Sequence, residues 1–80
     1  MIETIITQNE IQAVENGKLV GKIEFSLSEN QLSILHTYAY ESGRGIGILL
    51  MKSALKWAET NHYTVNAVCS FAQRYMASKS

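Results

Sequence analysis

The fold is decided by residues 41–50, which read Glu-Ser-Gly-Arg-Gly-Ile-Gly-Ile-Leu-Leu. Three glycines alternate with other residues in this stretch, and an apolar run with helical spacing continues from it. Glycine permits positive φ and leaves room for a ligand, so successive N–H groups can converge on an anion at the positive end of a helix dipole. The stretch therefore predicts either a phosphate or pyrophosphate cradle or a flexible strand-to-helix turn with nothing bound.

Upstream of this stretch the sequence has the period of β-strands. Asn16-Gly17 lies between apolar runs and predicts a two-residue hairpin turn, because both central positions of that turn need positive φ. Residues 28–31 are polar and predict a second turn. Residues 2–7 fit either a short extra strand or a loose end. In the run 32–40, simple alternation places one set of side chains on the same face: Leu32, Ile34, His36, Tyr38 and Tyr40.

Downstream of residue 45 the period becomes helical. One predicted helical face carries Ile46, Leu49, Leu50, Ser53 and Trp57. We expect Asn61 to end this helix in the left-handed conformation, residues 64–68 to form a fourth strand, and Ser70 with Gln73 to form a capping box before a helix over 71–77. The predicted order is β-β-β-α-β-α. The fold class is α+β, a mostly antiparallel twisted sheet of about four strands with two helices, in a single domain over residues 1–80.

Composition excludes several function classes. The 80 residues carry seven basic and seven acidic side chains, which argues against a nucleic-acid binder. The single cysteine excludes an internal disulfide, and His36, His62 and Cys69 have no metal-ligand spacing. No apolar run reaches about 18 residues and no signal peptide is recognisable, so we expect a cytoplasmic protein without a membrane partner.

Two common phosphate-binding motifs do not fit the glycine stretch. A Rossmann fingerprint needs glycine or alanine at position 48, where Ile48 stands. A P-loop needs glycine immediately before its lysine, whereas Met51 precedes Lys52. The stretch therefore belongs to another class of anion-binding turn, if it binds an anion.

The run from Gly43 to Leu50 resembles the coenzyme A loop of the GNAT superfamily of N-acetyltransferases, whose pattern is Gln/Arg-x-x-Gly-x-Gly/Ala. Gly45 and Gly47 match the two glycine positions, whereas Ser42 departs from the first position. The predicted order of elements is also similar to the superfamily core without its N-terminal helices.

Short members of the superfamily, reduced to a minimal core, fit better. The pairs His36-Thr37 and Cys69-Ser70 match them in order and spacing around the loop. The resemblance implies that loop amides bind acetyl-CoA or coenzyme A, and that backbone N–H groups near Tyr38 and Ala39 hold the thioester oxygen. On this basis the residues assigned to the cofactor are Tyr38, Ala39, Ser42, Gly43, Arg44, Gly45, Ile46, Gly47, Ile48 and Ser70.

Four side chains each have a chemical and a structural interpretation. Cys69 precedes a predicted helix N-terminus, which favours a negative sulfur, so it is either a nucleophile or channel residue or a small buried residue. By the resemblance, Tyr75 protonates the leaving coenzyme A thiolate; alternatively its ring packs on the sheet. His36 is either a general base or a core histidine bonded to the backbone. Arg44 either pairs with phosphate or lies exposed in a turn.

The resemblance implies an acyltransferase that moves acetyl from acetyl-CoA to an unidentified amine. Two alternatives remain open from the sequence: a coenzyme A binding module without turnover, and an interaction protein that pairs through an open sheet edge. A small domain with sheet edges is also a possible homodimer. The glycine loop separates these functions, because only the enzyme and the binding module need Gly45 and Gly47.

Overall fold

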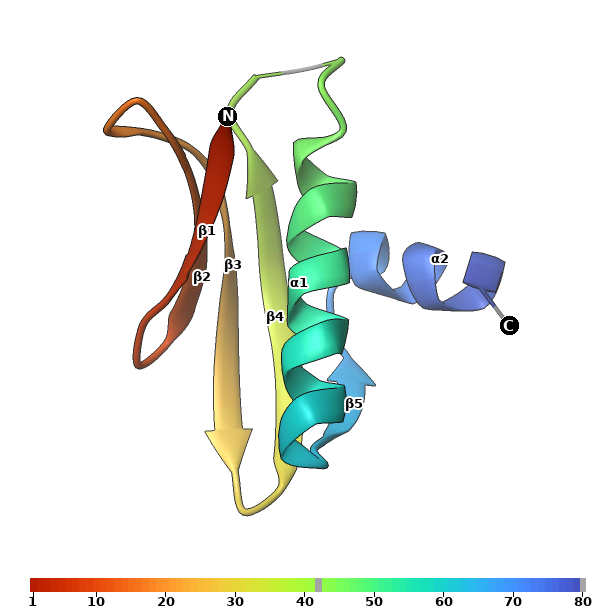
Figure 1. Ribbon diagram of the computed structural model, residues 1–80. Coiled ribbons are helices and arrows are strands. Elements are labelled where there is room, and N and C mark those ends of the chain that lie inside the picture. The colour runs from red at the N-terminus through yellow and green to blue at the C-terminus, as the bar shows by residue number, and fades with distance from the viewer. Residues whose placement is uncertain (42, 80) are drawn as a thin grey trace.

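The computed structural model describes residues 1–41 and 43–79 and has one sheet with a helix along one face (Figure 1). The five strands follow the order β1-β2-β3-β4-β5 in space as in sequence. The elements are β1 (Ile2–Ile6), β2 (Glu10–Glu15), β3 (Lys18–Ser28), β4 (Gln31–Ala39), α1 (Ile46–Asn61), β5 (Thr64–Ala67) and α2 (Ser70–Lys79). The predicted α+β class is confirmed, and residues 2–6 form the extra strand.

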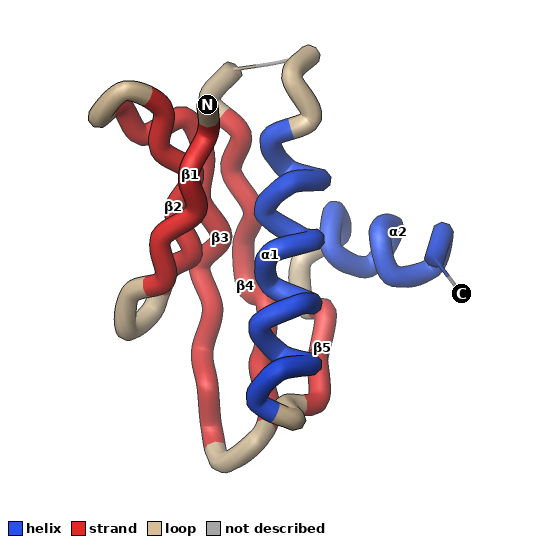
Figure 2. Tube along the Cα trace, in the orientation of Figure 1, coloured by secondary structure: helices blue, strands red, loops and turns tan. Residues whose placement is uncertain are grey.

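Strands β1 to β4 form an antiparallel meander, and β5 pairs with β4 in the parallel direction after the α1 crossover. The predicted hairpin turn is present, with φ of 52° at Asn16 and 80° at Gly17. The second turn joins Ser28 to Gln31, with Glu29 at a φ of 56°. The tube in Figure 2 shows that the strands occupy one layer and that both helices lie outside it.

A β-bulge in β4 overturns the predicted face of its second half. Phe25 pairs with Ile34 and Glu24 pairs with His36, so Leu35 is one residue in excess. Simple alternation therefore fails between Ile34, which is fully buried, and His36, which is exposed. Beyond the bulge, Thr37 and Ala39 face the loop side, while His36 and the two tyrosines that follow it at alternate positions turn outward.

Helix α1 packs its buried stripe on the sheet. This stripe consists of Ile46, Gly47, Leu50, Met51, Ala54 and Ala58, about one position away from the predicted face. The helix approaches β3 closely at Gly21, where an added Cβ would lie 2.5 Å from the Ile46 side chain and 2.7 Å from the Tyr38 carbonyl oxygen. Glycine at position 21 therefore fixes the depth at which the start of α1 lies on the sheet.

Both predicted helix boundaries differ from the structure by one residue. The left-handed residue that ends α1 is His62, with a φ of 60°, and Asn61 is still helical. The predicted capping box of Ser70 and Gln73 is wrong, because the Gln73 side-chain amide donates to the carbonyls of Ala67 and Val68 instead. The residue in the capping position is Cys69, whose carbonyl accepts the Gln73 backbone N–H at 3.0 Å.

Among the described residues, neither helix is long and apolar enough to cross a membrane.

Candidate functional site

Among the described residues, no acceptor pairs with the backbone N–H groups at the start of α1. Gly43 and Gly45 have φ values of 77° and 68°, and an added Cβ at either position would meet no atom within 4 Å. Gly45 is the N-cap of α1, and no side chain caps it. The first helical bond runs from the Leu49 N–H to the Gly45 carbonyl at 3.0 Å. The N–H groups of residues 46–48 therefore have no acceptor within the helix and lie at the positive end of its dipole.

An open cavity of about 210 Å³, called here the loop cavity, lies beside these donors. Its floor on the β4 side includes Thr37 and Ala39, and Phe71 of α2 forms part of its wall. The complete lining is Thr37, Ala39, Glu41, Gly43, Gly45, Ile46, Gly47, Ile48 and Phe71. The glycine loop and the second half of β4 therefore share one depression.

The second half of β4 has an open edge next to this cavity. Pairing with β5 ends at Ile34, whose carbonyl accepts the N–H groups of both Val68 and Cys69. On the other side, the Tyr40 N–H donates to the Val20 carbonyl of β3 at 2.9 Å. Since successive residues of a strand point their backbone groups to opposite sides, the Tyr38 N–H is directed at β3 and the Ala39 N–H at the open edge. Of the two predicted oxyanion donors, Ala39 has the suitable direction and Tyr38 does not.

Cys69 lies where β5 ends and α2 begins, with its sulfur between two polar groups. Its Sγ accepts the Ala72 N–H at 3.3 Å, the bond expected of an N-cap side chain. The same Sγ lies 3.4 Å from the Thr37 hydroxyl oxygen, and either atom can be the donor. The side chain is partly buried. A thiol in this place accepts a hydrogen bond from a helix terminus and touches a residue of the loop cavity.

Arg44 is held by carboxylates and does not line the loop cavity. Its guanidinium forms a bidentate pair with Glu15 of the β2–β3 hairpin at 2.7 and 2.9 Å, and a further bond to Glu41 at 2.6 Å. The hydrogen bonds from Arg44 lower the pKa of both Glu15 and Glu41, and the two carboxylates raise the pKa of Arg44. The arginine therefore ties the loop to the hairpin.

Comparisons with known proteins place this geometry in a family. Residues 8–80 match the family model described as GCN5-related N-acetyl-transferase. The chain belongs to the GCN5-related N-acetyltransferase family. Membership confirms the resemblance and the predicted enzyme class, an acetyltransferase. A search of curated proteins gave no match.

Solved structures of GCN5-related proteins have the same fold. A GCN5-like protein of Staphylococcus aureus superposes with a TM-score of 0.78 at 23% identity, covering 96% of this chain and 79% of that one. PaiA N-acetyltransferase of Thermoplasma acidophilum, solved with coenzyme A, gives 0.61 at 23% identity and covers 68% of this chain. A Bacillus anthracis protein solved with acetyl-coenzyme A gives 0.62 at 20% identity and covers 94%. The present chain spans only 35% and 48% of the last two chains.

The structure brings most of the predicted cofactor residues of this family member together. Ala39 and the loop residues Gly43, Gly45, Ile46, Gly47 and Ile48 line one cavity. Gly47 differs from the other two glycines, because an added Cβ there would lie 2.8 Å from the Phe71 ring. Its lack of a side chain thus admits Phe71 rather than leaving free space for a ligand. Ser70 is exposed in the first turn of α2, and Ser42 lies outside the described residues.

The predicted catalytic residues are not all in one place. Cys69 contacts Thr37, a residue that lines the loop cavity. His36 is exposed on the opposite face of β4, where its ring lies 6.1 Å from that of Tyr38. The interpretation of His36 as a core histidine is wrong. Tyr75 is half-buried in α2 and lines a neighbouring cavity that shares Phe71 with the first. Tyr75 is also packed against the hydrophobic core.

Three residues of the site were missed by sequence reasoning. Thr37 was part of the quoted His36-Thr37 pair, but the bulge that turns it inward has no clear sequence signal. Phe71 was taken only as the start of a helix, although it packs on Gly47. Glu15 lies 29 residues before Arg44, and nothing local links the two. Among the described residues, no group of three or more His, Cys, Asp or Glu side chains is arranged to hold a metal ion.

Proposed function

We propose that this chain binds acetyl-CoA at the glycine loop and transfers the acetyl group to an amine. The observation that carries the proposal is the loop cavity itself, in which an uncapped helix N-terminus adjoins an open strand edge. Backbone N–H groups at a helix N-terminus are a common site for phosphate. Gly43 and Gly45 leave open space beside those groups, so the residues present fit a diphosphate.

The open edge of β4 suits the other end of the same molecule. A pantetheine chain carries amide groups, which hydrogen-bond to strand edges in the way that peptides do. In this interpretation, Thr37 and Ala39 line its path and the Ala39 N–H polarises the thioester carbonyl. Acetyl-CoA supplies the activated acetyl group, and the protein supplies the amides that bind and orient it.

Cys69 is the preferred nucleophile for a two-step transfer. Its sulfur attacks the thioester carbonyl carbon, a new C–S bond forms at Cys69, and the bond to the coenzyme A sulfur breaks. The cysteine proton goes to the departing thiolate. The amine nitrogen then attacks the acetyl carbonyl carbon and forms a C–N bond. The bond between that carbon and the Cys69 sulfur breaks, and the amine proton goes to the sulfur. Thr37 and the Ala72 N–H both lie within hydrogen-bonding reach of that sulfur.

Direct attack by the amine is the alternative mechanism. It needs a base that reaches the loop cavity, and His36 lies on the other face of the sheet. The carboxylate that does line the cavity, Glu41, is paired with Arg44. This arrangement also favours the second candidate function, a coenzyme A binding module without turnover.

Amide chemical shifts during titration with coenzyme A test the binding site. We expect the largest shifts at Gly43 and residues 45–48, with smaller ones at Thr37 and Ala39. Pantetheine, which lacks the diphosphate, is the matched ligand and should move the β4 amides more than those of the loop. Saturation with coenzyme A without any loop shift would contradict the proposal.

Mass spectrometry after mixing with acetyl-CoA separates the two mechanisms. The Cys69 route predicts an acetyl group on Cys69, absent in Cys69→Ala. It also predicts that bound coenzyme A slows alkylation of the thiol. If saturating coenzyme A does not change the alkylation rate and no acetyl adduct forms on Cys69, the Cys69 route is wrong. Direct transfer to the amine and binding without turnover then remain.

A further inference from the structure

Side-chain packing does little to hold the loop before α1. Among the described residues, no atom lies within 4 Å of a Cβ added at Gly43 or Gly45, so packing confines neither glycine. Glycine also loses more backbone freedom than any other residue when it is ordered. Arg44 stands between these two glycines, and its side chain is held by the rest of the fold. Arg44 is therefore the residue through which the fold can order this part of the loop.

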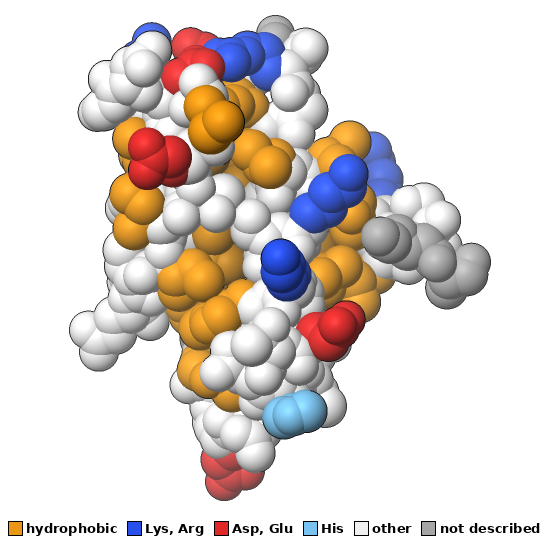
Figure 3. Space-filling view, viewed as in Figure 1, with side chains coloured by type: hydrophobic (Ala, Val, Ile, Leu, Met, Phe, Trp, Pro, Cys, Tyr) orange, Lys and Arg blue, Asp and Glu red, His pale blue; other side chains and the backbone are white. Residues whose placement is uncertain are grey.

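Arg44 belongs to a charge cluster that also contains Glu15, Lys18 and Glu41. Its guanidinium pairs with Glu15 at 2.7 and 2.9 Å and with Glu41 at 2.6 Å. The other carboxylate oxygen of Glu41 lies 3.5 Å from the Lys18 ammonium nitrogen. Glu15 and Lys18 are cross-strand partners, so both ends of this chain of charges return to the β2–β3 hairpin. Figure 3 shows acidic and basic side chains next to each other at the top of the view, where the β2–β3 turn and the loop lie in Figure 1.

The β2–β3 hairpin is a firm support for the charge cluster. The two central residues of its turn have the positive φ that a two-residue turn requires, 52° at Asn16 and 80° at Gly17. The Tyr40 N–H donates to the Val20 carbonyl at 2.9 Å, which joins the chain immediately before Glu41 to β3. The carboxylates that hold the arginine therefore both come from backbone that the sheet fixes.

We propose that Glu15 is a positioning residue for the coenzyme A loop, acting through Arg44 without touching the cofactor. This inference rests on the proposed function, in which the N–H groups of residues 46–48 hold the diphosphate. A bidentate guanidinium–carboxylate pair fixes an orientation as well as a distance. The pair therefore keeps Gly43 and Gly45 in the positive-φ conformation that leaves those donors open to the cavity. The loop is then ordered before the cofactor binds, and binding does not bear that cost.

A direct role for Arg44 on the diphosphate would give the opposite result. If Arg44 left its carboxylates to pair with phosphate, Glu15 would compete with the ligand, and removing Glu15 would tighten binding. In the structure, Arg44 makes three bonds to carboxylates and is not among the residues that line the loop cavity. This geometry favours the anchoring role. The two roles differ in the sign of the effect of Glu15→Gln on cofactor affinity.

Titrations of Glu15→Gln with coenzyme A and with pantetheine, followed by amide chemical shifts, test the proposal. We expect the affinity for coenzyme A to fall about fivefold, as it would if the loop were ordered in about one fifth of the free molecules. Pantetheine lacks the diphosphate, so its affinity should not change, whereas a general loss of structure would weaken both ligands. Arg44→Gln should lose at least as much affinity for coenzyme A. Adding Glu15→Gln to it should cost nothing further, because both substitutions remove one contact.

Glu10→Gln is the matched control, because it also neutralises a β2 carboxylate that belongs to an ion pair. Glu10 pairs with Lys22 at 2.8 Å. After its removal Lys22 keeps a second carboxylate partner, Glu24, as the arginine keeps one in the Glu15 variant. Glu10 and Lys22 are not among the residues that line the loop cavity. Both affinities of this variant should therefore equal those of the unmodified chain.

Backbone relaxation measured by NMR in the free chain gives a second readout that needs no ligand. The amides of Gly43 and Gly45 should move more freely in Glu15→Gln than in the unmodified chain, and Glu10→Gln should leave their motion unchanged. Equal loop motion in the two variants would overturn the positioning role of Glu15.

The affinities decide between the remaining outcomes. An unchanged affinity of Glu15→Gln for coenzyme A, or an equal fall in Glu10→Gln, would overturn the positioning role. An increased affinity would overturn it as well and would assign Arg44 to the diphosphate. In all three cases a Gly45 amide that shifts with coenzyme A leaves the proposed function standing. If saturating coenzyme A does not shift that amide in the unmodified chain, the proposed function and this inference are both wrong.

Discussion

The two halves of β4 differ in how their backbone and side chains are used. Residues 31–34 pair with β3 on one side and β5 on the other, and Ile34 is fully buried. Residues 37–39 pair with β3 alone, and their inward side chains line an open cavity. The bulge at Leu35 lies between the halves, so one extra residue separates a strand that holds the fold from a strand edge that can hold a ligand.

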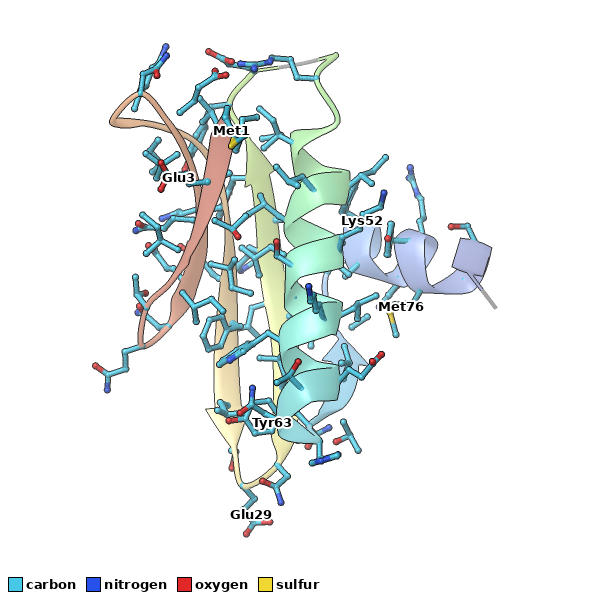
Figure 4. All side chains as sticks on the ribbon, in the orientation of Figure 1. Met1, Glu3, Glu29, Lys52, Tyr63 and Met76 are labelled. Carbon is cyan, nitrogen blue, oxygen red and sulfur yellow. The ribbon has the colours of Figure 1, made fainter. Side chains whose placement is uncertain are left out.

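The closed half is also sealed by aromatic rings. Phe25, the β3 partner of Ile34, lies 5.3 Å from the Trp57 ring, and Trp57 meets Tyr63 edge-on at 5.4 Å. Figure 4 shows Tyr63 at the end of the molecule where the β3–β4 turn lies. At the other end the start of α1 carries glycines and uncapped N–H groups. Stability and binding are therefore expected to respond to substitutions at opposite ends of one strand.

The largest expected effect is on stability in the closed half. Ile34→Ala removes a fully buried side chain between two strands and should cost about 3 kcal/mol of unfolding free energy. A domain of this size has about 4 to 12 kcal/mol in total, so the variant should lose between a quarter and three quarters of its stability. Urea unfolding followed by circular dichroism measures the loss. Thr37→Val, in the open half, is the matched substitution and should change stability by less than about 1 kcal/mol.

The next effect separates the glycines of the loop. Gly47→Val places a side chain against the Phe71 ring and should destabilise the fold by about 2 kcal/mol through overpacking. Gly45→Val meets no neighbour but forces a β-branched residue to positive φ, which costs about 1 to 2 kcal/mol.

Phe71→Leu added to each of the two glycine variants is the control. It should recover part of the lost stability of Gly47→Val and none of the loss in Gly45→Val. Urea unfolding of the four variants measures this. Equal recovery in both backgrounds would mean that Phe71 does not determine the need for glycine at position 47.

Much of the fold could be predicted from local sequence, because local rules decide it. Asn16-Gly17 has few conformational alternatives, and the change from period two to helical spacing after residue 45 locates the crossover. The bulge at Leu35 could not be predicted, because the residues around it show no sequence signal that one of them is left out of the pairing with β3. Alternation alone therefore put His36 on the wrong face.

The candidate site was predictable where a motif is contiguous and not where the fold assembles it. The loop residues were found from their glycines, and five of them line the cavity. The capping position was misplaced because Ser70 is a common N-cap residue, yet Cys69 beside it occupies the position. The Arg44–Glu15 pair depends on the β2–β3 hairpin lying next to the loop, which only the assembled sheet provides.

A smaller effect concerns the cap at the start of α2. Cys69→Ala removes the acceptor of the Ala72 N–H and should cost about 1 kcal/mol of stability. Cys69→Ser keeps an acceptor at the same position and should lose less. Acetyl transfer, if it passes through the sulfur, should be lost in the alanine variant and strongly reduced in the serine variant. Equal stability of the two variants in urea would show that the sulfur does not act as a cap.

The smallest expected effect is the pH dependence of the loop anchor. Arg44 lowers the pKa of Glu15 from its ordinary value of 4.5, so the charged carboxylate is favoured in the folded chain. A carboxylate with a lowered folded pKa stabilises the fold above its unfolded pKa, and this contribution is lost as the pH falls below about 4.5. The pair is at the surface, so the contribution is small and weakens in salt.

Glu15→Gln should therefore lose less stability than the unmodified chain between about pH 6 and about pH 3. Glu3→Gln is the control, because Glu3 is exposed on β1 and belongs to none of the ion pairs found among the described residues. Urea unfolding at the two pH values gives the comparison. An acid loss in Glu15→Gln as large as in the Glu3 control would mean that the Arg44 pair does not stabilise the loop in solution.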